Sequence, residues 1–162
     1  MRALTNAQWG FESNCFVCEA ANERGLRIEF LHDQEARRVV AEFCLDSAFS
    51  GAPSYVHGGI VLAILDEAMA WATIAIAGRF AVTTTTTARF DHPVRVDRAY
   101  RVEARVTEVN VDVIEATAAV SDSKNRKCAT ASASFAPLGP AQARSAIGTE
   151  LRGEDAGYLR PS

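Results

Sequence analysis

Residues 55–78, YVHGGIVLAILDEAMAWATIAIAG, form the most apolar stretch of the chain, yet two acidic residues stand side by side in its middle. The apolar run 60–76 is shorter than the roughly 20 residues that span a bilayer. An aspartate at mid-membrane, as Asp66 would be, costs about 2.5–3.5 kcal/mol. The stretch therefore predicts a helix that is wrapped by protein, with Glu67 beside Asp66 at its centre, and no membrane span.

The segments on both sides of this helix are typical of β-strands. Before it, GLRIEFL alternates apolar and polar residues, and RRVVAEFCL follows the polar turn HDQEA, which predicts a hairpin from about 26 to 45. After it come four strand-like segments: AVTTTTTARFDHPV, AYRVEARVTEVN, VDVIEATAAVSD and RKCATASASFAPL. Their short polar separators predict that neighbours pair antiparallel as a meander. The predicted order is β-β-α-β-β-β-β.

Length and composition indicate one globular domain, and its net charge does not favour binding to nucleic acid or anionic membranes. The 162 residues are 48% hydrophobic and 23% charged, with a net charge of −3, so no global attraction to nucleic acid or anionic membranes is expected. The N-terminus lacks a signal-peptide pattern, which predicts a cytoplasmic protein. We expect residues 1–137 to form the domain, with 1–25 packed on it, and 138–162 to form a tail that is disordered or partly helical around 141–152.

The chain has four cysteines, and we expect them to be reduced thiols. They are too few and too scattered for a disulfide framework. Cys15 and Cys18 form a Cys-x-x-Cys pair, which supplies two of the four ligands of a structural zinc, whereas Cys44 and Cys128 stand singly in strands. Packing of reduced thiols is the favoured interpretation of the pair, zinc is the alternative, and no metal is predicted. No βαβ pattern supports a thioredoxin-like role.

A long apolar helix in an antiparallel protein must be covered on most faces, as a curved sheet wrapped about it would do. HGGIVLAILDEAMA at the helix and ARFDHPV at the next strand resemble the hotdog-fold thioesterases, of the phenylacetate-pathway and 4-hydroxybenzoyl-CoA type, over about residues 9–137. CFVCEAANERGL is similar to an N-terminal pattern of that family. The resemblance implies an α+β hotdog fold, with one long central helix wrapped by a curved antiparallel sheet of about six strands.

The family pattern is His-Gly-Gly, six residues, then Asp or Glu, and His57, Gly58, Gly59 and Asp66 match it. The first N–H groups of a helix are free and lie at its positive end, and glycines let a carbonyl oxygen approach them, as an oxyanion hole requires. A tight turn is the alternative role of the glycines. Because Asp66 lies about 12 Å along the axis from Gly58, one carbonyl cannot touch both in one chain. A shared site therefore predicts a homodimer, and the family also contains homotetramers.

The resemblance implies that Asp66 acts as a base or a nucleophile, with Gly58, His57 and Thr83 completing the catalytic set. Glu67 points about 100° away from Asp66 and is expected to be structural, although it joins the candidate substrate-binding set. That set comprises Gly59, Glu67, Thr73 and Arg89.

Two details of the motif region bear on how water and substrate are placed. The threonine run predicts that Thr83, Thr85 and Thr87 share one face of their strand. Several relatives have Asn or Gln six residues before the histidine, where this chain has Gly51, so the placement of water departs from the family pattern. Ser50 and Ser54 are candidate substitutes.

The predicted function is hydrolysis of an acyl-CoA thioester to the free acid and CoA, with no cofactor apart from the CoA of the substrate itself. The alternatives are a noncatalytic acyl-CoA-binding or regulatory protein and a hotdog hydratase that acts on acyl thioesters. Candidate contacts of the CoA phosphates are Arg89, Arg95, Arg98, Lys124, Arg126 and Lys127.

Overall fold

The computed structural model describes residues 1–148 and has a strand at or overlapping each strand-like segment, although the first strand begins later than predicted. The expected hairpin is formed by β2 (Phe30–Asp33) and β3 (Arg38–Cys44), but residues 25–29 of the predicted first strand form no strand, and β2 extends into the predicted turn. The central helix is α1 (Gly58–Ala75). The four strands after it are β6 (Ala81–Phe90), β7 (Ala99–Val109), β8 (Ile114–Asp122) and β9 (Lys127–Pro137). Further elements are β1 (Arg2–Leu4), η1 (Asn6–Trp9), η2 (Ser47–Phe49), β4 (Ser50–Ala52), β5 (Tyr55–Val56) and α2 (Pro140–Ile147).

Seven strands form one antiparallel sheet in the order β1-β2-β3-β7-β8-β9-β6. The predicted meander is correct for β7, β8 and β9 but wrong for β6, which pairs with β9 at the far edge instead of with β7. The connection 91–98 can reach about 26 Å when extended. Three strand spacings amount to only about 14 Å, so the chain can cross the end of the sheet from β6 to β7.

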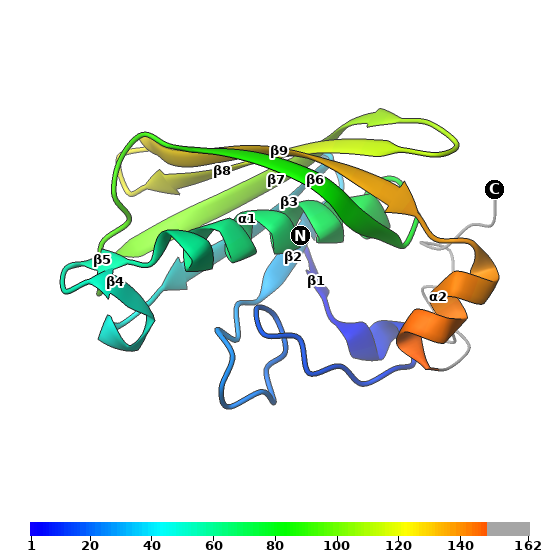
Figure 1. Cartoon of the computed structure of the whole chain (residues 1–162), viewed down its shortest axis with the longest axis horizontal. Coiled ribbons are helices and arrows are strands. Elements are labelled where there is room, and N and C mark those ends of the chain that lie inside the picture. The colour runs from blue at the N-terminus through cyan, green and yellow to red at the C-terminus, as the bar shows by residue number, and fades with distance from the viewer. Residues whose placement is uncertain (149–162) are drawn as a thin grey trace.

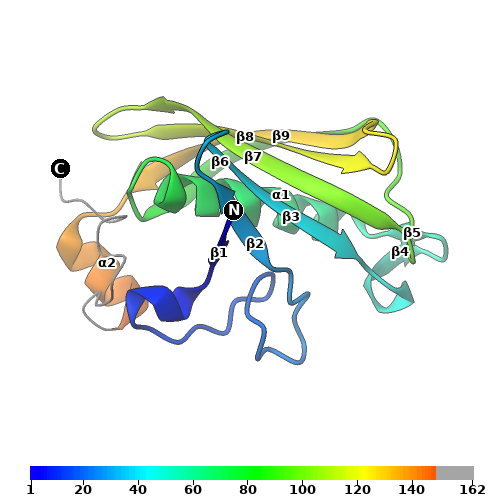
Figure 2. The same cartoon turned by 180° about the vertical axis from the view of Figure 1, so that it is seen from behind.

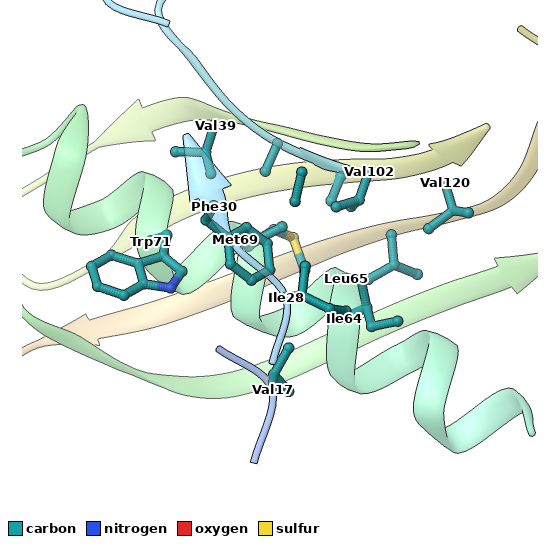
Figure 3. Packing of buried hydrophobic residues seen from close by; sticks show 14 of the residues in the cluster. Val17, Ile28, Phe30, Val39, Ile64, Leu65, Met69, Trp71, Val102 and Val120 are labelled. Atoms are coloured by element: carbon teal, nitrogen blue, oxygen red, sulfur yellow. The ribbon is translucent and has the colours of Figure 1, made fainter. Parts of the chain in front are cut away.

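Helix α1 lies along one face of this sheet, and the N-terminal segment covers part of the side of α1 that faces away from the sheet (Figures 1 and 2). Ten α1 residues are buried, among them Ile64, Leu65 and Met69. Figure 3 shows these side chains beside Phe30 and Val102 in the core. The α+β architecture with one central helix, expected for a hotdog fold, is thus confirmed.

By length and composition α1 could cross a membrane. That criterion is weak for a single helix, because the core helix of a globular domain passes the same test. Here more than half of the helix is buried inside the protein.

Backbone hydrogen bonds hold the two arms of the N-terminal loop together. Leu26 N–H donates to the Phe16 carbonyl at 2.7 Å and Ile28 N–H to the Val17 carbonyl at 2.9 Å. A Cβ at Gly25 would lie 2.6 Å from the Phe16 oxygen, so only glycine permits this approach. At the other end of the chain, α2 overlaps the helix expected around 141–152. Residues 149–152 of that expectation, like most of the predicted tail, lie outside the described residues.

Candidate functional site

The start of α1 is organised by His57, which caps the helix with its ring. Nδ1 of His57 accepts the Gly59 N–H at 2.9 Å, and the His57 N–H donates to the Phe49 carbonyl at 2.9 Å. A Cβ at Gly59 would lie 3.1 Å from Nδ1, so the second glycine of the motif makes room for the cap. Because Nδ1 is an acceptor, the proton of a neutral His57 is on Nε2, which can donate to a ligand.

Gly58 is the first residue of the helix, and its N–H is hydrogen-bonded to none of the described residues. A Cβ at this position would meet no atom within 4 Å, so packing within one chain does not explain a glycine here. The Gly59 N–H is already used by His57. The donor that the helix start can offer to an oxyanion is therefore the Gly58 N–H, at the positive end of the α1 dipole.

Asp66 lies in the middle of α1 and is half-buried. The Thr83 hydroxyl, near the start of β6, donates to its Oδ1 at 3.0 Å. This contact fixes the carboxylate and leaves its second oxygen without a described partner. The structure thus joins two of the predicted catalytic residues, which stand 17 positions apart in the chain.

The prediction that Thr83, Thr85 and Thr87 share a face is wrong, because the strand pairing shifts register between Thr83 and Thr85. Thr83 pairs with the buried Phe135, on the helix side of the sheet, whereas Thr85 pairs with Ser134. The extra residue, Thr84, moves all later positions to the opposite face.

The same shift puts Arg89 on the outer face of the sheet. It pairs with Thr130, two positions further along the face that carries Ser132 and Ser134. Its exposed guanidinium contacts Asp91 at 3.1 Å. Arg89 is therefore separated by the sheet from Asp66 of the same chain.

Thr73 is fully buried, and its hydroxyl donates to the Ala70 carbonyl at 2.9 Å. Within one chain it belongs to the core of the helix and does not open onto the surface. Gly51 lies close to the motif, since a Cβ there would be 3.2 Å from Cα of His57. A larger residue at position 51, such as the family's Asn or Gln, would require the loop to move.

Glu67 faces away from Asp66 and contacts the cysteine pair of the N-terminal loop. Its Oε1 lies 3.3 Å from the Cys15 Sγ, and one ligand atom from each of Cys15, Cys18 and Glu67 fits within 4.8 Å of the others. Burial raises the pKa of Glu67 to about 8, and hydrogen bonds, first that from the Cys18 thiol, lower the pKa of Cys15 to about 5. The hydrogen bonds to its sulfur thus favour the thiolate form of Cys15, and burial favours the neutral form of Glu67. No feature of the sequence indicates that Glu67 is the residue that meets the pair.

Among the hollows on the described surface are two beside the sheet, and neither is lined by Gly58 or Asp66. The first, about 720 Å³, lies on the outer face of the sheet. The second, about 620 Å³, lies at the β8–β9 turn, the end of the sheet at which α1 begins (Figure 1). Its basic residues are Arg95, Arg98, Lys124 and Arg126. Arg95 also stacks on the Tyr55 ring, two residues before the cap, with 5.3 Å between the guanidinium carbon and the ring centroid.

Comparison with known proteins gives one family match. Residues 54–129, which run from the loop before α1 into β9, match the model of the Thioesterase superfamily. No curated protein matches the sequence.

Solved structures share the fold at low sequence identity. RHA08564, a thioesterase superfamily protein, has a TM-score of 0.67 at 18% identity over 71% of this chain, which spans 56% of the length of RHA08564. The PaaI protein of the phenylacetic acid degradation operon of E. coli has a TM-score of 0.63 at 17% identity, covering 70% of this chain and 81% of that one. A Streptococcus mutans UA159 protein bound to acetyl-CoA has a TM-score of 0.60 at 15% identity, covering 63% and 82%. At these identities the likeness concerns the fold.

Proposed function

We propose that the protein is a hotdog-fold thioesterase that hydrolyses acyl-CoA thioesters to a free acid and CoA. The observation that carries the proposal is the division of the motif into two halves. The Gly58 N–H lies at the helix start and donates to none of the described residues, and Asp66 is held by Thr83 near the helix centre. The family match over residues 54–129 includes both halves.

Asp66 and Gly58 can together carry out each step of thioester hydrolysis. The free oxygen of Asp66 removes a proton from a water molecule, whose oxygen attacks the thioester carbon. The carbonyl electrons move to oxygen, and the oxyanion accepts the Gly58 N–H. When the carbonyl re-forms, the C–S bond breaks and the CoA thiolate takes the proton from Asp66. The same placement allows direct attack by the carboxylate, followed by hydrolysis of the acyl anhydride.

The two halves are about 12 Å apart along one helix, so the proposal places Gly58 of one subunit opposite Asp66 of another. Strand β6 offers the surface for this dimer. It is an edge strand of the sheet, ten residues long, with Val82 48% and Phe90 52% exposed. A long edge strand with exposed apolar residues is suited to pairing with a second copy.

The two-fold symmetry of such a dimer determines which part of α1 contacts α1 of the second subunit. In a two-fold dimer with antiparallel helices, a residue at position 58 faces one at position 66 when the axis passes close to position 62. Leu62 stands there, four residues from both Gly58 and Asp66 and therefore on the same side of the helix. It is half-buried in the single chain and is not among the described residues that pack against the core. In the dimer, the Leu62 side chains of the two subunits would meet at the axis and shield each other from water.

The hollow at the α1 end of the sheet is the proposed contact for the CoA phosphates. Arginine and lysine side chains bind phosphate through charge-assisted hydrogen bonds. Arg95, Arg98, Lys124 and Arg126 gather there, at the end of the sheet where the helix begins. The S. mutans neighbour, of the same fold, is bound to acetyl-CoA.

The test is a CoA-release assay over short, medium, branched and aromatic acyl-CoAs. We expect turnover by the parent and a loss of about 10²- to 10⁴-fold in kcat for Asp66→Asn, because the amide cannot accept the proton. Glu42→Gln, at an exposed carboxylate on β3, is the matched control and should retain activity.

Full activity in Asp66→Asn would overturn the assignment of the base. Saturable acyl-CoA binding without turnover of any thioester would instead favour the noncatalytic role. Addition of water to an enoyl thioester, without CoA release, would favour the hydratase.

A further inference from the structure

The second acid of the central helix belongs to a cluster that the proposed hydrolysis does not use. Cys15 and Cys18 lie in the N-terminal loop and Glu67 lies in α1. The cluster therefore brings together two segments that are about 50 positions apart in the chain. All three are half-buried. Two thiols and a carboxylate gathered beneath the surface are the donors that proteins use to bind zinc.

The cysteine turn is already arranged as a metal-binding turn. The Val17 and Cys18 N–H groups point at the Cys15 sulfur, at 3.4 and 3.5 Å. Such N–H donors stabilise a thiolate ligand and fix its direction, as outer hydrogen bonds do around metal sites. The backbone of the turn therefore holds Cys15 in the orientation of a ligand.

Asn22 and Gly25 hold the N-terminal loop that carries the cysteine turn in place. Asn22 donates through Nδ2 to the Asn14 carbonyl at 3.1 Å and lies 3.4 Å from the Cys15 carbonyl. Gly25 permits the close approach to Phe16 described above. The cysteine pair and residues 22–26 thus belong to one local structure, which presents two sulfurs to the helix.

We propose that Cys15, Cys18 and Glu67 bind a zinc ion with two sulfurs and one carboxylate oxygen. Zinc accepts this mixed donor set in tetrahedral geometry, at about 2.3 Å for sulfur and about 2.0–2.2 Å for oxygen. The described protein ligands number three, so a water molecule completes the coordination. The bound ion would tie the N-terminal loop to the middle of α1, one residue from Asp66. This inference does not rest on the proposed hydrolysis.

The site can be tested by metal content and by cobalt spectroscopy on the full chain. Protein purified without chelator should contain about one zinc per chain. After chelation, added Co²⁺ should give a thiolate-to-cobalt charge-transfer band and intense visible bands of a tetrahedral ion. Cys15→Ser/Cys18→Ser should abolish these signals, and Glu67→Gln should weaken zinc binding at least about 10-fold, whereas Cys44→Ser, at an exposed cysteine of β3, should match the parent.

Thermal melting of the chelated parent, with and without added Zn²⁺, keeps the test independent of how well the variants fold. We expect zinc to raise the Tm of the parent, because it binds the folded state. The proposal is overturned if the parent binds Zn²⁺ no more tightly than the double cysteine variant, or if zinc leaves the parent Tm unchanged. Neither readout involves thioester turnover, so failure here and failure of the proposed hydrolysis are told apart.

Discussion

Asp66 and Glu67 are neighbours in the sequence, but the structure gives them unrelated surroundings. Asp66 accepts a hydrogen bond from Thr83 on the β6 side of the helix, whereas Glu67 meets the cysteine turn of the N-terminal loop. The roughly 100° between successive helical residues is enough to direct them to different elements. At the residue scale, the proposed chemistry therefore depends on single atoms, namely the free Asp66 oxygen and the Gly58 N–H.

The Gly58 N–H can be removed without removing the helix. Proline lacks the N–H but is favoured at the first helical position, and the ψ of 133° at His57 suits a residue before proline. We expect Gly58→Pro to lower kcat by about 10²- to 10³-fold, the loss typical of one oxyanion donor. Gly58→Ala keeps the N–H, and its Cβ meets open space in the single chain, so it should lose much less.

Steady-state kinetics of both variants check this prediction, with circular dichroism as the test of folding. Equal losses in Gly58→Pro and Gly58→Ala would show that the N–H is not the important group.

At the scale of elements, the site depends on the contact of α1 with β6. The bulge at Thr84 lets Thr83 face Asp66 while the following threonines turn to the outer surface. The other edge of β6 pairs with no described strand, and Leu62 lies one helical turn before Asp66 on the same side of α1. One symmetric contact can therefore cover both the strand edge and this side of the helix.

A charge at position 62 should weaken the dimer without disturbing the fold, because Leu62 is not among the described residues that pack against the core. Leu62→Glu removes the apolar contact at the two-fold axis and brings two carboxylates together there. We expect the dimer Kd to rise at least about 10-fold, as for like charges brought together at an interface. Sedimentation equilibrium measures the Kd, and circular dichroism checks the fold.

Val111→Glu is the control, because it replaces another apolar side chain with the same charge, in the turn between β7 and β8, where Val111 is 78% exposed. A dimer as tight in Leu62→Glu as in Val111→Glu would contradict the proposed axis, and a parent that stays monomeric would contradict the dimer.

At the scale of the whole molecule, neither of the two hollows described above is lined by Gly58 or Asp66, the two halves of the proposed site. The dimer proposed above would complete two equivalent sites, each with Asp66 of one subunit and Gly58 of the other. The proposed zinc site, in contrast, is contained within one chain. Loss of the dimer should thus abolish hydrolysis while leaving metal binding intact.

Mixed dimers test the sharing of residues directly. Asp66→Asn and Gly58→Pro, each nearly inactive alone, should recover about a quarter of the parent activity when co-expressed. Random assortment makes half of the dimers mixed, and each mixed dimer has one site with both native residues. CoA release by the co-expressed pair measures this, and separately purified proteins mixed without exchange serve as the control.

No recovery in a population shown by mass spectrometry to contain mixed dimers would contradict a site that joins Asp66 of one subunit to Gly58 of the other.

The sequence by itself determined the elements and the motif of this protein. Its 60–76 apolar run and period-two segments predict the central helix and six strands, because hydrophobic periodicity reflects local burial. The His-Gly-Gly motif and its spacing to Asp66 follow from the resemblance to the hotdog thioesterases, and helix geometry adds that Gly58 and Asp66 lie about 12 Å apart. Tertiary structure decided the rest. The edge position of β6, the bulge at Thr84 and the meeting of Glu67 with Cys15 depend on which distant segments pair, and such pairing leaves no trace in local periodicity.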